Sequence, residues 1–209
     1  MNEKTTRWYV ELIPPNALGV LDRFTAAPVL DEFYLAGGTG LALTLGHRRS
    51  RDFDFFSRNL FDENLLLQKI KNPLSVTSKA SHTLHLDIDG IKVTFLGYSY
   101  PLLFPASEFN GVKAADVRDI ARMKIDAISS RGAKRNFIDL YTVARKFGLA
   151  ELIKLFDQKH AGTHYNRVHI LKSLTYFDDA ESEPMPDMTT HVTWEMVKGF
   201  FLSEVPKLL

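Results

Sequence analysis

The chain has 209 residues, no cysteine and a formal net charge of +1. The absence of cysteine excludes disulfides and thiolate metal sites. A net charge near zero means that any contact with nucleic acid must come from a local basic patch. No apolar run approaches the length of a membrane span, and the N-terminus is too polar for a signal peptide, so we expect a cytoplasmic protein.

The first elements predicted along the chain are helical. Residues 1–14 show no regular pattern, and we expect them to be poorly constrained. Apolar residues then recur at helical spacing over residues 15–27, and Pro28 should end this helix. We expect a short helix over residues 29–32 before the chain becomes strand-like.

A strand, a glycine turn and a short helix come next. Residues 33–36 are apolar and strand-like, Gly37 and Gly38 interrupt them, and Thr39 is suited to cap the helix that follows. A glycine turn between a strand and a helix offers free backbone N–H groups to an anion. The turn therefore predicts a phosphate-binding site.

Acidic and apolar residues alternate in the sequence Asp52-Phe53-Asp54-Phe55. The period of two in a strand puts both carboxylates on one face and both rings on the other. Two like charges side by side repel, and such a placement usually means that they share a cation. We predict that Asp52 and Asp54 bind Mg²⁺. The alternative is a solvated strand face.

A basic stretch separates the helix from the two acids. It contains His47, Arg48, Arg49 and Arg51. Cationic side chains at this place would attract the phosphates of a nucleotide or an RNA. The alternative is that they form salt bridges with the neighbouring carboxylates.

One helix and three strands complete the first half. Asp62 is a plausible N-cap for a helix that Pro73 stops, with Leu65, Leu66 and Ile70 on its apolar face. Residues 74–80 should form a strand.

The clearest local feature is a hairpin around Asp89-Gly90, the preferred two-residue turn. This turn pairs Ile88 with Ile91, and it places Asp87 opposite Lys92 and His85 opposite Thr94. One face of the hairpin is then apolar, and the other is polar.

From about Val112 the periodicity becomes helical, so we divide the chain into a mixed sheet lobe, residues 1–111, and a helical lobe, residues 112–209. Neither lobe has an obvious linker, and we expect one folding unit. The predicted helices cover residues 116–131, 134–147, 150–160, 165–177 and 193–209, with a polar loop over residues 178–190.

The glycine turn, a spacer of roughly ten residues and the alternating acids together resemble the signature of the polymerase-beta-like nucleotidyltransferases. The longer string, in which GHRRS leads into DFDFF, is similar to the AbiEii/AbiGii toxin family of nucleotidyltransferases. The resemblance extends from about residue 13 to the end of the chain. It implies an α+β fold, with a small mixed sheet flanked by helices, a mostly helical C-terminal lobe, and the active cleft between the lobes.

The resemblance also implies an activity. A nucleoside monophosphate would pass from an NTP to an acceptor hydroxyl, with Mg²⁺ and release of pyrophosphate. It makes tRNA a candidate acceptor and the protein a candidate toxin with a cognate antitoxin. Gly37, Gly38 and Thr39 would hold the triphosphate.

A third carboxylate commonly comes from a neighbouring strand in the wider superfamily, and here Thr94 stands where we would look for it. Asp87 lies on the same predicted face and is a candidate metal ligand in its place. The alternative for Asp87 is a simple pair with Lys92.

The helical lobe contains a second stretch that resembles the family, MKIDAISSRGAKRNFIDL. Lys124 and Asp139 match the functional Lys and Asp of the family. Lys124 would touch the triphosphate, and Asp139 would orient Lys124 or an arginine, or act as a base on the acceptor hydroxyl. Arg131 and Lys134 could add phosphate contacts. Family members commonly carry an acid where this chain has Asn136. The alternatives are a solvated charge for Lys124 and a helix cap or surface pair for Asp139.

Two other functions stay open at this point. Thr94 and Asn136 favour a nucleotide-binding or RNA-binding module that has lost catalysis. The acceptor could also be a protein or a small molecule, because a fold does not determine the acceptor.

Overall fold

The computed structural model describes residues 7–25, 29–70, 75–162 and 165–209. The chain divides into two compact units, Met1–Asp116 and Val117–Leu209. The division falls after the position expected from the sequence, because strand β7 (Val112–Ala114) pairs with β1 (Tyr34–Leu35) and so belongs to the sheet.

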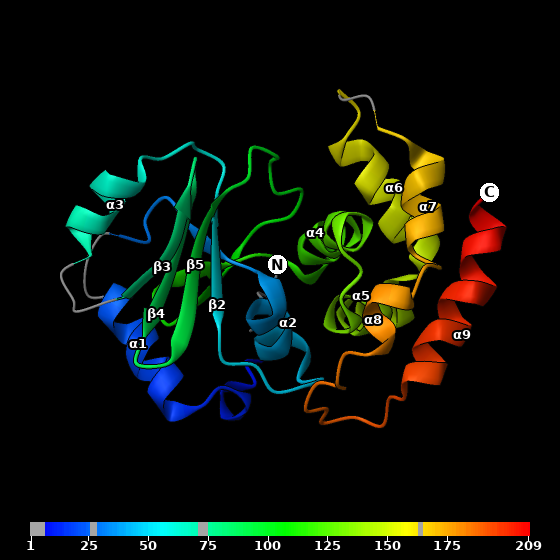
Figure 1. Ribbon diagram of the computed structural model, residues 1–209, viewed down its shortest axis with the longest axis horizontal. Helices are drawn as coiled ribbons and strands as arrows, with labels where there is room; N and C mark the ends of the chain where they lie inside the picture. The colour runs from blue at the N-terminus through cyan, green and yellow to red at the C-terminus, as the bar shows by residue number, and fades with distance from the viewer. Residues whose placement is uncertain (1–6, 26–28, 71–74, 163–164) are drawn as a thin grey trace, which may run out of the picture. The chain divides into compact units, whose positions relative to one another are not determined.

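A mixed sheet forms the centre of the first unit (Figure 1). In the described residues its order is β3-β4-β5-β2-β1-β7-β6. β2 runs parallel to β5, and β1 runs parallel to β7, while the other neighbours are antiparallel. The remaining strands are β2 (Phe53–Ser57), β3 (Ser75–Ala80), β4 (Thr83–Ile88), β5 (Ile91–Gly97) and β6 (Ser107–Phe109). The sequence analysis missed β6 and β7, since strands of three residues carry too little periodicity to detect.

The helical elements of this unit are η1 (Val10–Leu12), α1 (Pro15–Thr25), α2 (Gly37–Leu45) and α3 (Glu63–Lys69). The prediction of a poorly constrained N-terminus is wrong from Tyr9 onward. The N–H of Tyr9 donates to the carbonyl of Leu43, and the side chains of Leu12 and Ile13 are buried. The predicted stop at Pro28 lies outside the described residues.

Two further predictions, a helix over residues 29–32 and a buried Leu65, are wrong. Residues 29–32 form turns and a bend rather than a helix, and the N–H of Phe33 donates to the carbonyl of Leu30 at 3.0 Å, which closes a single turn. Leu65 was expected on the buried face of α3 but is 59% exposed, whereas Leu66 and Ile70 are buried. The cap of α3 is confirmed, since the Asp62 carboxylate accepts the backbone N–H groups of Asn64 and Leu65. Pro73 lies outside the described residues.

The predicted hairpin is confirmed in every pair. Ile88 faces Ile91, Asp87 faces Lys92, and His85 faces Thr94. Asp89 and Gly90 both have left-handed backbones, with φ of +54° and +78°. A two-residue turn of this type requires both values, which explains the Asp-Gly pair.

Aromatic rings fill the core on one face of the sheet. Phe53, Phe55 and Phe95 are fully buried there, and Phe24 from α1 meets Phe95 edge to face at 5.7 Å between centroids. The alternation in β2 thus places both phenylalanines of the acidic motif in the core, as predicted.

The second unit is helical (Figure 1). Its α4 packs against α5, α6 and α7, and the ring of Phe137 lies at the centre of an aromatic cluster with Phe177, Trp194 and Phe201. Among the described helices, none has the length and apolar character needed to cross a membrane. The elements are α4 (Val117–Ser130), α5 (Lys134–Phe147), α6 (Leu149–Lys159), α7 (Arg167–Ser173), α8 (Asp178–Glu181), α9 (Trp194–Glu204) and η2 (Val205–Leu208).

The bounds of α5 match the prediction, and Gly148 follows it with φ of +84°. The prediction of a loop over residues 178–190 is wrong for its first residues. The short helix α8 forms there because Ala180 is buried against the rest of the unit. α7 is also shorter than expected and gives way to turns after Ser173.

Candidate active site

The glycine turn and the Asp54 side chain lie in contact. Gly37 opens α2 with φ of +63°, a conformation that favours glycine. A side chain on Gly37 would overlap the Asp54 carboxylate, and the N–H of Ala36 donates to the Asp54 carbonyl at 3.0 Å. One carboxylate of the acidic motif is thus held at the first turn of α2.

Thr39 ties the same helix to the other acidic residue. Its hydroxyl donates to the backbone carbonyl of Asp52 and lies 2.7 Å from the Ser50 hydroxyl. The predicted capping role is wrong, because the N-cap residue is Ala36 and Thr39 lies within the helix. Thr39 instead fixes the spacing between the turn and the acids.

Asp54 lies on the face of the sheet opposite the aromatic core. Asp54 is half-buried between the fully buried Phe53 and Phe55, and Asp52 comes directly before β2. The Asp52 carboxylate lies 3.7 Å from Nε of Arg51 and accepts the N–H of Lys92 at 3.4 Å.

The donor set suits Mg²⁺ as a nucleotide-bound ion. Within the described residues, no group of three or more histidine, aspartate or glutamate side chains is placed to share a metal ion. Mg²⁺ is usually held by one or two carboxylates, substrate phosphates and water rather than by a full protein cage. Two carboxylates near a glycine turn at the start of a helix fit that pattern.

Thr94 is the neighbour of Asp54 on the next strand, and His85 is the neighbour of Thr94. The imidazole Nδ1 of His85 lies 3.2 Å from the Thr94 hydroxyl. A hydroxyl next to an imidazole therefore occupies the place where the resemblance predicts a third carboxylate.

The structure does not bring Asp87 to the acidic pair. Lys92 lies between Asp87 and Asp52 in the sheet, and two strand spacings amount to about 10 Å. The Asp87 carboxylate accepts the N–H of Gly90 and so closes the hairpin turn. In the part of the chain that the structure describes, Asp87 forms no ion pair with Lys92, so that alternative is wrong as well.

The basic stretch is largely built into the fold. His47 and Arg48 are buried, and the Arg48 guanidinium packs against Gly38 and donates to the Arg49 carbonyl at 3.0 Å. Arg51 is exposed beside Asp52, as the salt-bridge alternative predicts. Arg48 and Arg51 therefore place positive charge at the turn and at the acids.

In the helical unit, Lys124 and Asp139 form a buried ion pair. Nζ of Lys124 lies 2.9 Å from Oδ2 of Asp139, and it donates to the Asn136 side-chain oxygen at 3.1 Å. The prediction that Asp139 orients Lys124 agrees with this contact. Asp139 is fully buried, so it has no access to an acceptor hydroxyl and does not fit the role of a base.

Lys134 is engaged in the fold, contrary to the predicted phosphate contact. Its ammonium donates to the carbonyls of Glu181 and Glu183 and lies 5.1 Å from the centre of the Trp194 ring. It therefore fixes the chain after α8. Arg131 is exposed, and no side-chain partner for it occurs among the described residues.

The sequence analysis missed a charged cluster between α4 and α6. Asp126 contacts Lys159 and lies 3.3 Å from Nε2 of His160. Burial raises the pKa of Asp126 to about 6 and lowers the pKa of Lys159 to about 7, and it also lowers the pKa of His160. The sequence feature that indicates this cluster is the helical spacing of Asp119, Arg122 and Asp126, which puts them on one side of α4.

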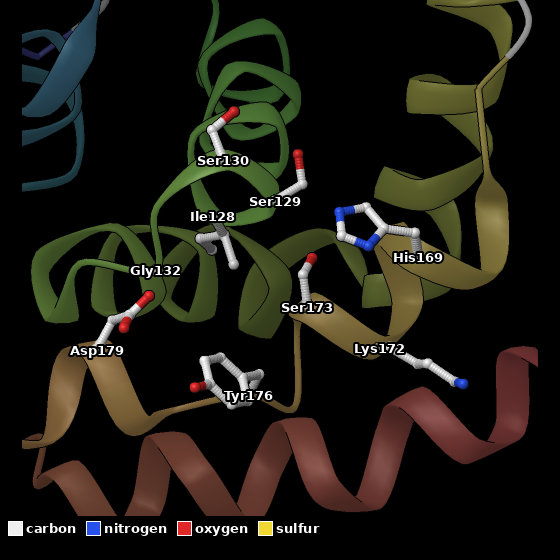
Figure 2. Close-up of a pocket in the computed structure, with 9 residues that line it drawn as sticks. All are labelled: Ile128, Ser129, Ser130, Gly132, His169, Lys172, Ser173, Tyr176 and Asp179. Atoms are coloured by element: carbon white, nitrogen blue, oxygen red, sulfur yellow. The ribbon is translucent and has the colours of Figure 1, made fainter.

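A pocket of about 350 Å³ lies within the helical unit (Figure 2). The His169 ring points between Ser129 and Ser173, and Tyr176 lies on the opposite wall. The serine hydroxyls already donate to carbonyls of their own helices. None of the predicted site residues lines it. The lining residues are Ile128, Ser129, Ser130, Gly132, His169, Lys172, Ser173, Tyr176 and Asp179.

Comparison with known proteins gives matches in sequence and in structure. Residues 19–95 match the family model described as "Nucleotidyl transferase AbiEii toxin, Type IV TA system", a range that contains the glycine turn and both acids. The uncharacterized protein aq_aa25 of Aquifex aeolicus is 39% identical over 197 residues, which cover 90% of this chain and 94% of that protein.

Two solved structures resemble the whole chain. MenT4, a nucleotidyltransferase toxin from Mycobacterium tuberculosis, has a TM-score of 0.55 and 15% identity, over 93% of this chain and 84% of that one. JHP933 from Helicobacter pylori has a TM-score of 0.48 and 16% identity, over 94% of each chain. The likeness to MenT4 confirms the α+β nucleotidyltransferase fold that the sequence predicted.

Proposed function

Because the chain belongs to the AbiEii nucleotidyltransferase toxin family, we propose that it transfers a nucleoside monophosphate from an NTP to an acceptor hydroxyl and releases pyrophosphate. The observation that carries the proposal is the contact between the Asp54 carboxylate and Gly37 at the start of α2. This contact supports the proposal, because it brings a carboxylate to the glycine turn.

The backbone of α2 would hold the triphosphate. The first N–H groups of a helix have no acceptor within it, and they carry the positive end of the helix dipole. Gly38 and Thr39 lie in that first turn. The buried guanidinium of Arg48 against Gly38 adds positive charge to the same place.

Asp52 and Asp54 would hold Mg²⁺ together with the phosphates. The bound ion would stabilise the oxygens that gain charge as pyrophosphate leaves. Arg51, beside Asp52, would neutralise the carboxylates in the absence of nucleotide.

Within the described part of the chain, the Lys124 ammonium has two side-chain acceptors. An ammonium has three donors, and Asp139 and Asn136 accept two of them. We assign the third to a phosphate oxygen of the NTP. Asn136 is neutral but still accepts a hydrogen bond from Lys124. The presence of asparagine where family members commonly have an acid therefore does not argue for lost catalysis.

We also propose an acceptor and a biological role. The proposal names RNA as the acceptor class, with tRNA as the first candidate, and a cognate antitoxin as the partner in the cytoplasm. The family description names a toxin–antitoxin system, which supports the antitoxin as the partner.

The test is labelling of an RNA pool by each radiolabelled NTP with Mg²⁺. Asp52→Asn should abolish labelling. Asp87→Asn is the matched control, because it removes a carboxylate from the same sheet face without touching the proposed site, and it should label normally. Full labelling by Asp52→Asn would refute the mechanism.

Calorimetry with NTPs and Mg²⁺, together with the labelling assay on RNA, protein and aminoglycoside acceptors, separates the alternatives. If the wild-type protein binds NTPs but labels nothing over all four NTPs and tRNA, a binding module is the better description. If the label appears on protein or on an aminoglycoside instead of RNA, the reaction stands and the acceptor class is wrong.

A further inference from the structure

Four aromatic side chains form a connected series in the sheet unit, which we call the aromatic ladder: Tyr34, Phe56, Tyr98 and Tyr100. The Tyr34 and Phe56 rings are stacked with centroids 6.0 Å apart. Tyr98 meets Phe56 edge to face at 5.8 Å, and Tyr100 lies 5.3 Å from Tyr98.

The aromatic ladder lies on the acid-bearing face of the sheet. Asp54 and Phe56 are two residues apart in β2, and both are half-buried while Phe53 and Phe55 are buried on the other face. Tyr34 is the partner of Phe56 on β1, and paired residues project to the same side. The N–H of Tyr98 donates to the Ser57 carbonyl at 2.7 Å, which continues the pairing of β5 with β2.

The aromatic core does not account for these rings. The core cluster of the sheet unit contains Phe53, Phe55 and Phe95, and none of the four ladder residues belongs to it. Tyr34 is buried behind Phe56, whereas Phe56, Tyr98 and Tyr100 keep part of their surface accessible. The ladder therefore offers ring surface on the face that carries the acids.

We propose that the aromatic ladder is a stacking platform for a nucleobase, with Phe56 and Tyr98 as the contacting rings and Tyr34 as their support. The proposal rests on the proposed function, since it takes Asp54 as the position of the reacting phosphate. Two residues along a strand span about 7 Å, which is comparable with the separation that a ribose imposes between a phosphate and its base. Every nucleobase has a π-face, so stacking binds a nucleotide without selecting which base it carries.

The base could come from the incoming NTP or from the end of the acceptor RNA, and the chemistry of recognition is the same. Phe56→Leu and Tyr98→Leu remove a ring but keep an apolar side chain, and Tyr98→Phe keeps the ring. The matched control is Phe61→Leu, because Phe61 is a partly buried ring in the same unit that packs on Phe33 and the core cluster. Thermal unfolding of each variant establishes that it is folded.

Binding to three probes by calorimetry decides the outcome: each Mg–NTP, Mg–tripolyphosphate, which has no base, and a short single-stranded oligoadenylate. If the platform holds the incoming base, Tyr98→Leu weakens NTP binding about tenfold and leaves tripolyphosphate binding unchanged. If it holds the acceptor base, oligoadenylate binding weakens instead. Tyr98→Phe and Phe61→Leu should match the wild type in both cases.

Unchanged binding of both NTP and oligoadenylate in the folded leucine variants would overturn the platform. A wild-type protein that binds neither NTP nor tripolyphosphate would refute the proposed function, and the oligoadenylate measurement would still decide the platform. Loss of tripolyphosphate binding in Tyr98→Leu would also overturn it, because the effect would then lie in the phosphate site.

Discussion

The Asp54 carboxylate packs so closely against Gly37 that no side chain can be placed on this glycine. Gly37→Ala combines two costs, because φ of +63° is unfavourable for alanine by about 1–2 kcal/mol and the new methyl group displaces the carboxylate. We expect NMP transfer to fall at least tenfold, with a loss of stability of about 2 kcal/mol, as measured by RNA labelling and urea unfolding.

Gly90→Ala separates these two costs. Gly90 has a similar φ of +78°, but the space around it is open. This variant should lose about 1 kcal/mol of stability and keep its transfer activity. Equal activity in Gly37→Ala and Gly90→Ala would show that the Asp54 contact is irrelevant to function.

The buried pair of Lys124 and Asp139 predicts opposite behaviour for stability and for activity. Lys124→Met removes the ammonium that lies 2.9 Å from the buried Asp139 carboxylate and should cost about 3 kcal/mol. The double variant Lys124→Met/Asp139→Leu should recover most of that stability, because no uncompensated charge remains. It should still be inactive in RNA labelling, since the Lys124 ammonium that would donate to a phosphate oxygen is gone.

An exposed pair serves as the control for this experiment. Lys207→Met removes the partner of Glu204 at the surface and should change the stability by less than about 0.5 kcal/mol. Transfer activity in the stable double variant would contradict the assignment of Lys124.

Lys134 should matter for folding rather than for nucleotide binding. Lys134→Met removes the donor to the carbonyls of Glu181 and Glu183, and we expect a loss of about 2 kcal/mol in urea unfolding. Binding of Mg–NTP to the folded variant should be unchanged. Arg131→Met, at an exposed position, should leave stability within about 0.5 kcal/mol of the wild type. Weaker NTP binding with unchanged stability in Lys134→Met would restore the phosphate role.

The cluster of Asp126 and Lys159 predicts a pH-dependent stability. The pKa of Asp126 is raised from 3.8 to about 6, so the stability that this group contributes is present below pH 3.8 and is lost as pH rises through about 6. The pKa of Lys159 is lowered from 10.5 to about 7, so its contribution is present above pH 10.5 and is lost as pH falls through about 7. Both contributions are at their smallest between these two values.

The test is the double variant Asp126→Leu/Lys159→Met, which retains Arg122 and His160 beside the site. Its stability relative to the wild type should be greatest between about pH 6 and pH 7. It should decline by about 1 kcal/mol or more toward lower and higher pH, as followed by urea unfolding. A difference that is constant with pH would show that these two groups do not titrate as described.

The sequence by itself determined the features whose causes are local. The register of the β4–β5 hairpin follows from a two-residue Asp-Gly turn and the alternation around it, because a slip of one residue would put apolar side chains on the polar face. The alternation of Asp52 to Phe55 likewise fixed which side chains enter the core. The bounds of α5 followed from helical spacing and the glycine after it.

Only the tertiary structure decided which distant residues meet. The parallel pairing of β2 with β5 puts Thr94 rather than Asp87 beside Asp54, and no local pattern specifies the partner of a parallel strand. Lys134 has the same sequence character as a phosphate-binding lysine, but carbonyls far along the chain take its hydrogens. The contact of Gly37 with Asp54 also depends on how α2 returns to the sheet, since a backbone this close to a carboxylate is set by packing and not by spacing.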